Sequence, residues 1–128
     1  MKFKILLVDD EKKMVNYLSE RLLIKGFDIT VAYSGKEALE YISEKDFDVV
    51  LLDVLMPEMD GIETLREIKK MKPMTEVIML TGHASVEAGV EGMKAGAFNY
   101  IMKPFDHNEL VTEINMACEH RQLKITGG

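Results

Sequence analysis

Short apolar runs alternate five times with longer stretches in which apolar residues recur every three or four positions. The longer stretches have the period of an amphipathic helix, whereas the short runs have the length of β-strands. The predicted strands cover residues 3–8, 27–32, 48–52, 77–80 and 99–102. Strands and helices that alternate at this spacing predict an α/β fold, in which helices cover both faces of a parallel sheet.

Capping residues mark the ends of several predicted helices. The first helix is expected over residues 11–25 and ends at Gly26, because glycine readily adopts the left-handed conformation that closes a helix. Ser34 and Asp106 each stand three residues before a glutamate, which predicts a capping box at the start of the second and fifth helices. Gly61 opens the third helix.

The fourth predicted helix differs from the others. Val86, Val90 and Met93 have helical spacing, but Gly89 and Gly92 stand among them. Each glycine costs about 1 kcal/mol relative to alanine in a helix interior. This helix is therefore predicted to be weakly stable, and it is a candidate moving part.

Polar residues follow four of the five predicted strands. Asp9 and Asp10 follow the first, Asp53 ends the third, Thr81 follows the fourth and Lys103 follows the fifth. The carboxyl ends of parallel strands meet at one edge of the sheet, where ligands of such folds bind. A carboxylate at the end of a strand buried on both faces is costly unless it is paired. We therefore predict a functional site at this edge.

Asp9, Asp10 and Glu11, converging with Asp53, predict a metal site. Carboxylates that converge repel one another unless a cation joins them. Oxygen ligands without cysteine or a suitable histidine favour a hard cation. Magnesium (Mg2+) fits best, because it takes one or two carboxylates, keeps several waters and shares oxygens with a phosphoryl group.

Each of these residues also has an ordinary structural explanation. One of the paired aspartates could cap the following helix, and Thr81 could cap the next one. Lys103 could be a solvated lysine, and its peptide bond to Pro104 would be trans, because most bonds that precede proline are trans. Tyr100 could be a half-buried strand aromatic, and His83 could be a solvated loop residue without a metal role.

Length and composition indicate one acidic domain. The chain has 128 residues, and 16 basic against 22 acidic side chains give a net charge of −6, which argues against direct nucleic-acid binding. The single cysteine, Cys118, excludes an internal disulfide and a cysteine-based metal cluster. No signal peptide and no stretch of ~20 apolar residues is present, which predicts a cytoplasmic protein without membrane association.

The polar residues at the strand ends belong to a larger ordered set of motifs. The set consists of Asp9-Asp10, Asp53 followed by Met56-Pro57 and Asp60-Gly61, Thr81, and Tyr100-Ile101-Met102-Lys103-Pro104-Phe105. It resembles the receiver domain of two-component response regulators, the CheY-like domains. The match predicts a receiver domain over residues 1–122 and a tail or truncated linker over 123–128. It implies a flavodoxin-like (βα)5 three-layer sandwich with strand order 2-1-3-4-5.

The same resemblance implies a role for each site residue. Asp53 would be the phosphoacceptor, and Mg2+ would be held by Asp10, Asp53 and the backbone carbonyl of Leu55, with Asp9 acting through water. Thr81 and Lys103 would contact the phosphoryl oxygens, Tyr100 would change rotamer with the switch, and the Lys103–Pro104 bond would be cis. The lifetime of the phosphoryl group would be tuned at Leu55 and His83. Structural roles would fall to Pro57, Gly61 and Pro104.

The implied function is a phosphorylation-controlled switch. A sensor histidine kinase would donate the phosphoryl group. The face of the fourth helix, fifth strand and fifth helix would then control an output domain that resembles those of AAA+ transcriptional activators. Alternatively, two copies of the chain would dimerise through this face. The chain would catalyse only its own phosphorylation and dephosphorylation. The alternatives are an interaction module that is not phosphorylated, an aspartyl-phosphate phosphatase, and a flavin or nucleotide binder. Leu55 stands where the phosphatases carry an aspartate, and no glycine-rich loop follows the first strand.

Overall fold

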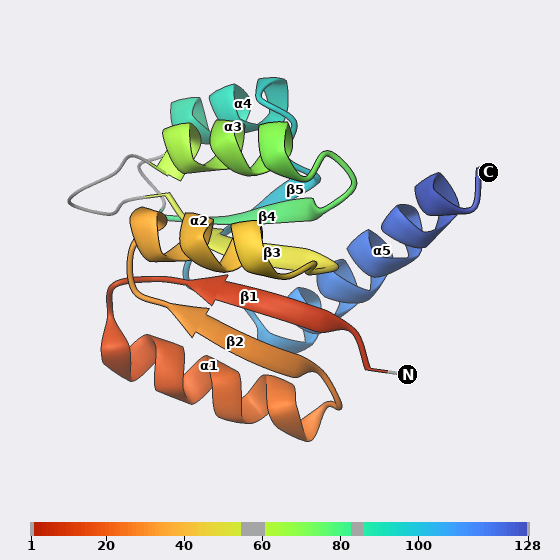
Figure 1. Cartoon of the computed structure of the whole chain (residues 1–128). Helices are drawn as coiled ribbons and strands as arrows, with labels where there is room; N and C mark the ends of the chain where they lie inside the picture. The colour runs from red at the N-terminus through yellow and green to blue at the C-terminus, as the bar shows by residue number, and fades with distance from the viewer. Residues whose placement is uncertain (1, 55–60, 83–85, 128) are drawn as a thin grey trace.

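Five parallel strands form one sheet in the order β2-β1-β3-β4-β5 (Figure 1). The structure, a computed structural model, describes residues 2–54, 61–82 and 86–127. The strands are β1 (Lys4–Val8), β2 (Asp28–Ala32), β3 (Val49–Asp53), β4 (Glu76–Thr81) and β5 (Asn99–Met102). The helices are α1 (Lys12–Ile24), α2 (Gly35–Glu44), α3 (Gly61–Met71), α4 (Val86–Lys94) and α5 (His107–Ile125). The predicted fold class and strand order are confirmed.

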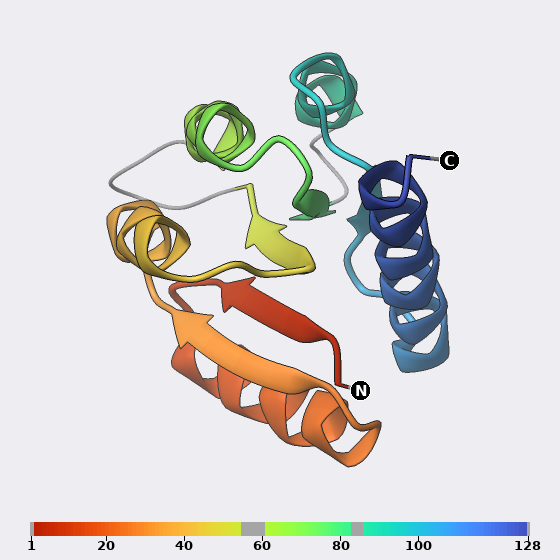
Figure 2. The same cartoon turned by 45° about the vertical axis from the view of Figure 1, so that its right-hand side comes forward.

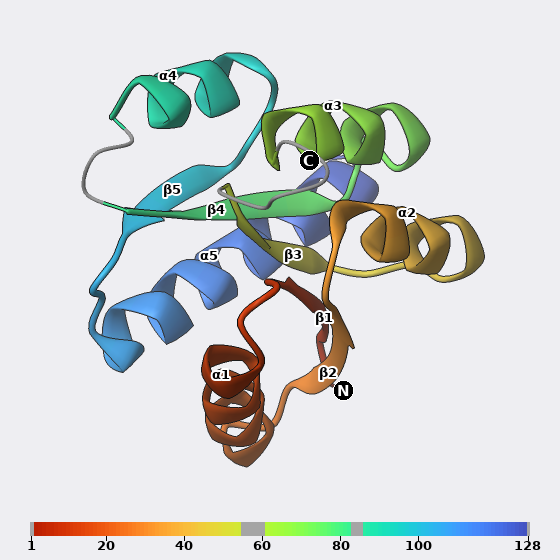
Figure 3. The ribbon, with the colours of Figure 1, turned by 90° about the vertical axis from the view of Figure 1, so that its left-hand side faces the viewer.

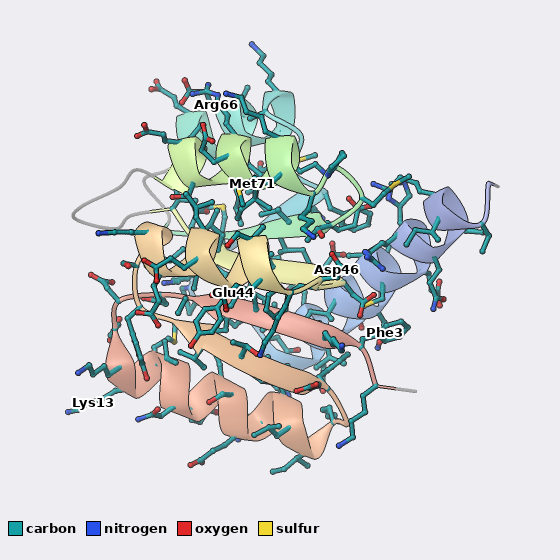
Figure 4. All side chains as sticks on the ribbon, in the orientation of Figure 1. Phe3, Lys13, Glu44, Asp46, Arg66 and Met71 are labelled. Atoms are coloured by element: carbon teal, nitrogen blue, oxygen red, sulfur yellow. The ribbon has the colours of Figure 1, made fainter. Side chains whose placement is uncertain are left out.

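Helices cover both faces of the sheet (Figure 2). Alternate strand residues enter two hydrophobic cores: Leu6 and Val50 face α2 and α3, whereas Ile5 and Leu51 face α1 and α5. All four of these side chains have no solvent exposure. Because both faces of each central strand are buried, its sequence is a continuous apolar run rather than an alternating one. Charged side chains, among them that of Lys13, project outward from the helices (Figure 4).

Gly26, Ser34 and Asp106 cap the helices as predicted, although Asp106 accepts from the N–H of Asn108 rather than from that of Glu109. Gly26 has φ +96°, and the N–H groups of Gly26 and Phe27 donate to the carbonyls of Leu23 and Leu22, at 3.0 and 3.2 Å. This pattern is a Schellman motif, which closes a helix with a left-handed residue. At the start of α2, the Ser34 hydroxyl accepts from a backbone N–H at 3.1 Å, and the Asp106 carboxylate does the same for α5. Local chemistry therefore defines these helix ends.

An ionic cluster at the amino edge of the sheet holds the C-terminal half of α5. Glu76, at the start of β4, is only 3% exposed. It pairs with Lys124 at 3.2 Å, with Lys69 of α3 at 3.7 Å, and with His120. These contacts support α5 as far as Ile125, three residues into the segment predicted as a tail. In the described part of the chain, no helix is long and apolar enough to cross a membrane.

His107, the first residue of α5, is expected to make folding stability depend on pH. Burial lowers its pKa from the ordinary value of 6.5, and the positive charges of Arg21 and Lys25 lower it further, against a smaller opposing effect of Asp106. Its buried Nδ1 has no hydrogen-bond partner among the described residues. Because the unfolded chain takes up this proton more readily, the free energy of unfolding is expected to fall as pH drops below about 6.5.

Urea denaturation at pH 7.5 and pH 5.5 measures this effect. The replacement His107→Gln is expected to reduce the loss of stability between the two pH values, because the variant has no imidazole at that position. The two proteins share every other ionisable group, so the difference between their pH dependences reports the imidazole of His107 together with its coupling to Asp106. An identical pH dependence in the two proteins would contradict the assignment.

Candidate functional site

Three aspartates meet at the carboxyl edge of the sheet, the edge that faces the viewer in Figure 3. Asp9 and Asp10 follow β1, and Asp53 ends β3, which pairs directly with β1 through the neighbours Val8 and Leu52. One carboxylate oxygen from each aspartate lies within 4.8 Å of the other two. Asp9 is 1% exposed and Asp53 is 7% exposed, whereas Asp10 is open to solvent. The predicted convergence is therefore confirmed for the three aspartates, whereas Glu11 is exposed and is not part of this group.

The backbone around Asp9 holds its carboxylate in the site. The N–H of Asp9 donates to the carbonyl of Ala32 at 3.1 Å, and its Oδ1 accepts from the N–H of Glu11 at 3.0 Å. Helix α1 begins at Lys12 with Glu11 as the N-cap residue, and no side chain makes a capping hydrogen bond there. The explanation of Asp9 and Asp10 as helix caps is therefore wrong.

Lys103 reaches the acids from the end of β5. Its Nζ lies 3.5 Å from Oδ2 of Asp9 and 3.7 Å from Oδ2 of Asp53, and its side chain is only 23% exposed. The Lys103–Pro104 peptide bond is cis, as the resemblance implied. The explanation of Lys103 as a solvated lysine does not hold. Its ammonium group offsets one of the three carboxylates.

Thr81 completes the edge from β4. It is 1% exposed, its carbonyl accepts from the N–H of Lys103 at 2.6 Å, and its Oγ1 has no hydrogen-bond partner among the described residues. Oδ2 of Asp9 is also buried without a hydrogen-bond partner among the described residues, although it forms the ion pair with Lys103. Leaving a buried polar atom unpaired costs about 1–3 kcal/mol. Two such atoms at one sheet edge point to a ligand that supplies the missing contacts.

The donor set defines the chemistry that this edge can perform. Among the described residues, three carboxylates and one ammonium leave a formal excess of two negative charges, which favours a divalent cation with oxygen ligands. The Lys103 ammonium and the Thr81 hydroxyl can donate to an anion beside the buried Asp53. Together these groups suit an oxyanion that is shared between a cation and the protein.

A family model described as the response regulator receiver domain matches residues 5–115, most of the chain. The chain belongs to the response-regulator receiver family. The predicted resemblance is therefore confirmed, and the site lies at the sheet edge where the receiver motifs converge.

Similar proteins include longer transcriptional regulators. This receiver domain is 44% identical over 119 residues to the transcriptional regulatory protein ZraR of Salmonella typhimurium, covering 93% of this chain but 27% of that protein. It superposes with a TM-score of 0.92 on a CheY-like receiver from Methanospirillum hungatei JF-1, with 31% identity and coverage of 97% and 99%. NtrX from Brucella abortus gives a TM-score of 0.92 and 32% identity, with coverage of 98% and 29%. The chain thus spans about a quarter of the length of the curated relatives it matches.

The remaining predicted site residues fall into two groups. Leu55, Pro57 and His83 lie outside the described residues of the receiver domain. Tyr100 is half-buried in β5 and packs against the core beneath α2 and α3. Its ring also lies against Gly89 of α4, a contact that sequence reasoning missed. The signal for it was a glycine inside a helix, which was interpreted only as a loss of stability.

Gly61 supports the end of β3 directly. Its N–H donates to the carbonyl of Val54 at 3.2 Å. A Cβ at this position would lie 2.6 Å from Cα of Val54 and 2.9 Å from the carbonyl oxygen of Asp53. Only glycine allows α3 of the receiver domain to begin so close to the end of β3.

Proposed function

We propose that this receiver domain accepts a phosphoryl group on Asp53 from the phosphohistidine of a sensor histidine kinase. The observation that carries the proposal is the Asp53 carboxylate, 3.7 Å from the Lys103 ammonium, among acids at the carboxyl edge of a receiver fold. Phosphoryl transfer needs positioned charges more than covalent chemistry from the protein. The site supplies such charges on a rigid sheet edge.

Each residue would have a defined task in the transfer. Asp53 attacks phosphorus in line, and the new P–O bond forms as the P–N bond to the kinase histidine breaks. Lys103 balances the charge of the transferred group, and the Thr81 hydroxyl donates to one of its oxygens, which gives that buried hydroxyl a partner. The receiver domain would catalyse only its own phosphorylation and dephosphorylation.

The acids fit Mg2+. Asp10 and Asp53 would bind it with the backbone carbonyl of Leu55, which lies outside the described residues, and Asp9 would act through water. The fit rests on the three convergent carboxylate oxygens and on the buried Oδ2 of Asp9, which has no hydrogen-bond partner among the described residues. When bound, the cation would neutralise charge on the phosphoryl oxygens.

The output would be a change of conformation at the face formed by α4, β5 and α5. A bias of about 5.5 kcal/mol takes a two-state switch from 1:99 to 99:1. Val90, Met93 and Met102 on this face are 49%, 42% and 39% exposed, which suits contact with another protein. The partner would be a second copy or an attached output domain, because the matching relatives are longer proteins that include transcriptional regulators.

Replacing the phosphoacceptor tests the proposed function. With Mg2+ and a small phosphodonor such as acetyl phosphate, the wild-type domain is expected to take up one labelled phosphoryl group, and Asp53→Asn none, because an amide is a poor nucleophile. Asp28→Asn is the matched control, since Asp28 is exposed at the opposite edge of the sheet. Equal labelling of wild type and Asp53→Asn, measured by intact-mass spectrometry, would overturn the proposal.

A further inference from the structure

The ring of Tyr100 occupies space that only a glycine at position 89 leaves open. A Cβ on Gly89 would lie 3.1 Å from Cε2 of the ring and 3.2 Å from both Cδ2 and Cζ. Ordinary van der Waals contacts of carbon atoms fall at about 3.5–4.0 Å. The ring therefore rests on the backbone of α4, and a Cβ at position 89 would require the ring or the helix to move by a few tenths of an ångström.

The second glycine of α4 faces a different side chain. A Cβ on Gly92 would overlap the thioether of Met79 in β4. Met79 and Tyr100 are neighbours in the β4–β5 register, and Gly89 and Gly92 lie three residues apart on one face of the helix. Thus α4, which lies beside β4 and β5 in Figure 3, presents two positions without side chains to these adjacent strands.

The two contacts differ in how they would respond to a methyl group. Methionine has three rotatable bonds, so the end of Met79 can turn away from a Cβ at position 92. The tyrosine ring is rigid and has only two side-chain torsions, so a Cβ at position 89 must displace the whole ring or the helix. Alanine raises helix propensity equally at both positions. A comparison of alanine at position 89 with alanine at position 92 therefore distinguishes displacement of the Tyr100 ring from a general increase in the stability of α4.

We propose that Gly89 is a positioning residue for Tyr100, and that it holds the unphosphorylated receiver domain in its resting conformation. The proposal rests on the proposed function, because the switch responds to phosphorylation of Asp53. Tyr100 lies two residues before Met102, which pairs with Thr81 at the site. The Gly89 contact thus joins α4 to the strand beside the buried hydroxyl. Displacing the ring disfavours the resting state and, by linkage, favours the conformation that accepts the phosphoryl group.

The experiment compares Gly89→Ala with Gly92→Ala in the full chain. Tyrosine ring resonances are recorded by NMR, with Tyr100 assigned from Tyr100→Phe, and the rate of phosphorylation by acetyl phosphate with Mg2+ is measured. Gly89→Ala is expected to shift the Tyr100 resonance and to raise the rate at least threefold. Gly92→Ala is expected to leave both within experimental error. An unshifted resonance, an unchanged or lower rate for Gly89→Ala, or the same changes in Gly92→Ala would overturn the proposal.

A double variant tests whether Gly89→Ala changes the phosphorylation rate without acting on the Tyr100 ring. In a Tyr100→Leu background, Gly89→Ala is expected to change the rate by less than 1.5-fold, because no ring remains to be displaced; a threefold change there would overturn the role of Tyr100. If the wild type takes up no phosphoryl group, the proposed function fails. The Tyr100 resonance still decides in that case whether Gly89 positions the ring.

Discussion

Replacing Gly61 with alanine is expected to lower the free energy of unfolding by about 3 kcal/mol, at the upper end of the cost of overpacking a core. The added Cβ would lie 2.6 Å from Cα and 2.7 Å from the carbonyl oxygen of Val54, and 2.9 Å from the carbonyl oxygen of Asp53. All three are backbone atoms, so no side-chain rotation relieves the contact. The end of β3 must move, and Asp53 moves with it.

The rate of phosphorylation of Gly61→Ala is expected to fall even under conditions in which the variant remains folded. A displacement of about 1 Å in a reacting group costs on the order of 100-fold in rate. Labelling of Gly61→Ala by acetyl phosphate should therefore be slower by about that factor, even at temperatures where the variant stays folded. Gly82→Ala is the control, because a Cβ there would meet nothing within 4 Å. Wild-type stability and labelling in Gly61→Ala would show that the contact between α3 and β3 is not tight.

Magnesium is expected to stabilise the domain strongly, and Asp10→Asn should remove most of that response. A ligand that binds only the folded state at 100 times its dissociation constant adds about 2.7 kcal/mol to the free energy of unfolding. The physical source is the group of three carboxylates, with one oxygen of each within 4.8 Å of the others, which the ammonium of Lys103 offsets only in part. Without metal, Asp10→Asn should be more stable than wild type, because one repulsive charge is gone.

Urea denaturation with and without MgCl2 measures both effects. Sodium chloride at matched ionic strength controls for general screening, which weakens interactions between exposed charges without occupying a site. Asp28→Asn, an exposed aspartate at the far edge, should respond to Mg2+ as the wild type does. Equal stabilisation of wild type and Asp10→Asn would show that the cation binds elsewhere.

Much of the fold could be predicted because its signals are local. Helix caps such as Gly26 and Ser34 act within a few residues, and the apolar runs reflect burial of each strand on both faces. The positions of Asp9, Asp53 and Lys103 at the ends of these runs predicted that they would share an edge, since all strands of a parallel sheet end there. The family motifs added the strand order and the cis bond before Pro104.

Other features could not be predicted, because they depend on which side chains meet across the sheet. The glycines of α4 were interpreted as a weakness of the helix, yet Gly89 and Gly92 admit Tyr100 and Met79 from two strands. The pairing of Glu76 with His120 and Lys124 of α5 joins residues more than forty positions apart along the chain. No local pattern predicts such contacts.

The sequence by itself determined the order of strands and helices, the edge of the sheet that carries the site, and the residue types available there. Only the tertiary structure decided that Lys103 lies within ion-pair distance of both Asp9 and Asp53, and that Thr81 keeps a buried hydroxyl without a partner among the described residues. The physical reason is the range of the interactions. Periodicity and capping act over one or two turns of chain, whereas the geometry of the site depends on strand register and packing between distant segments.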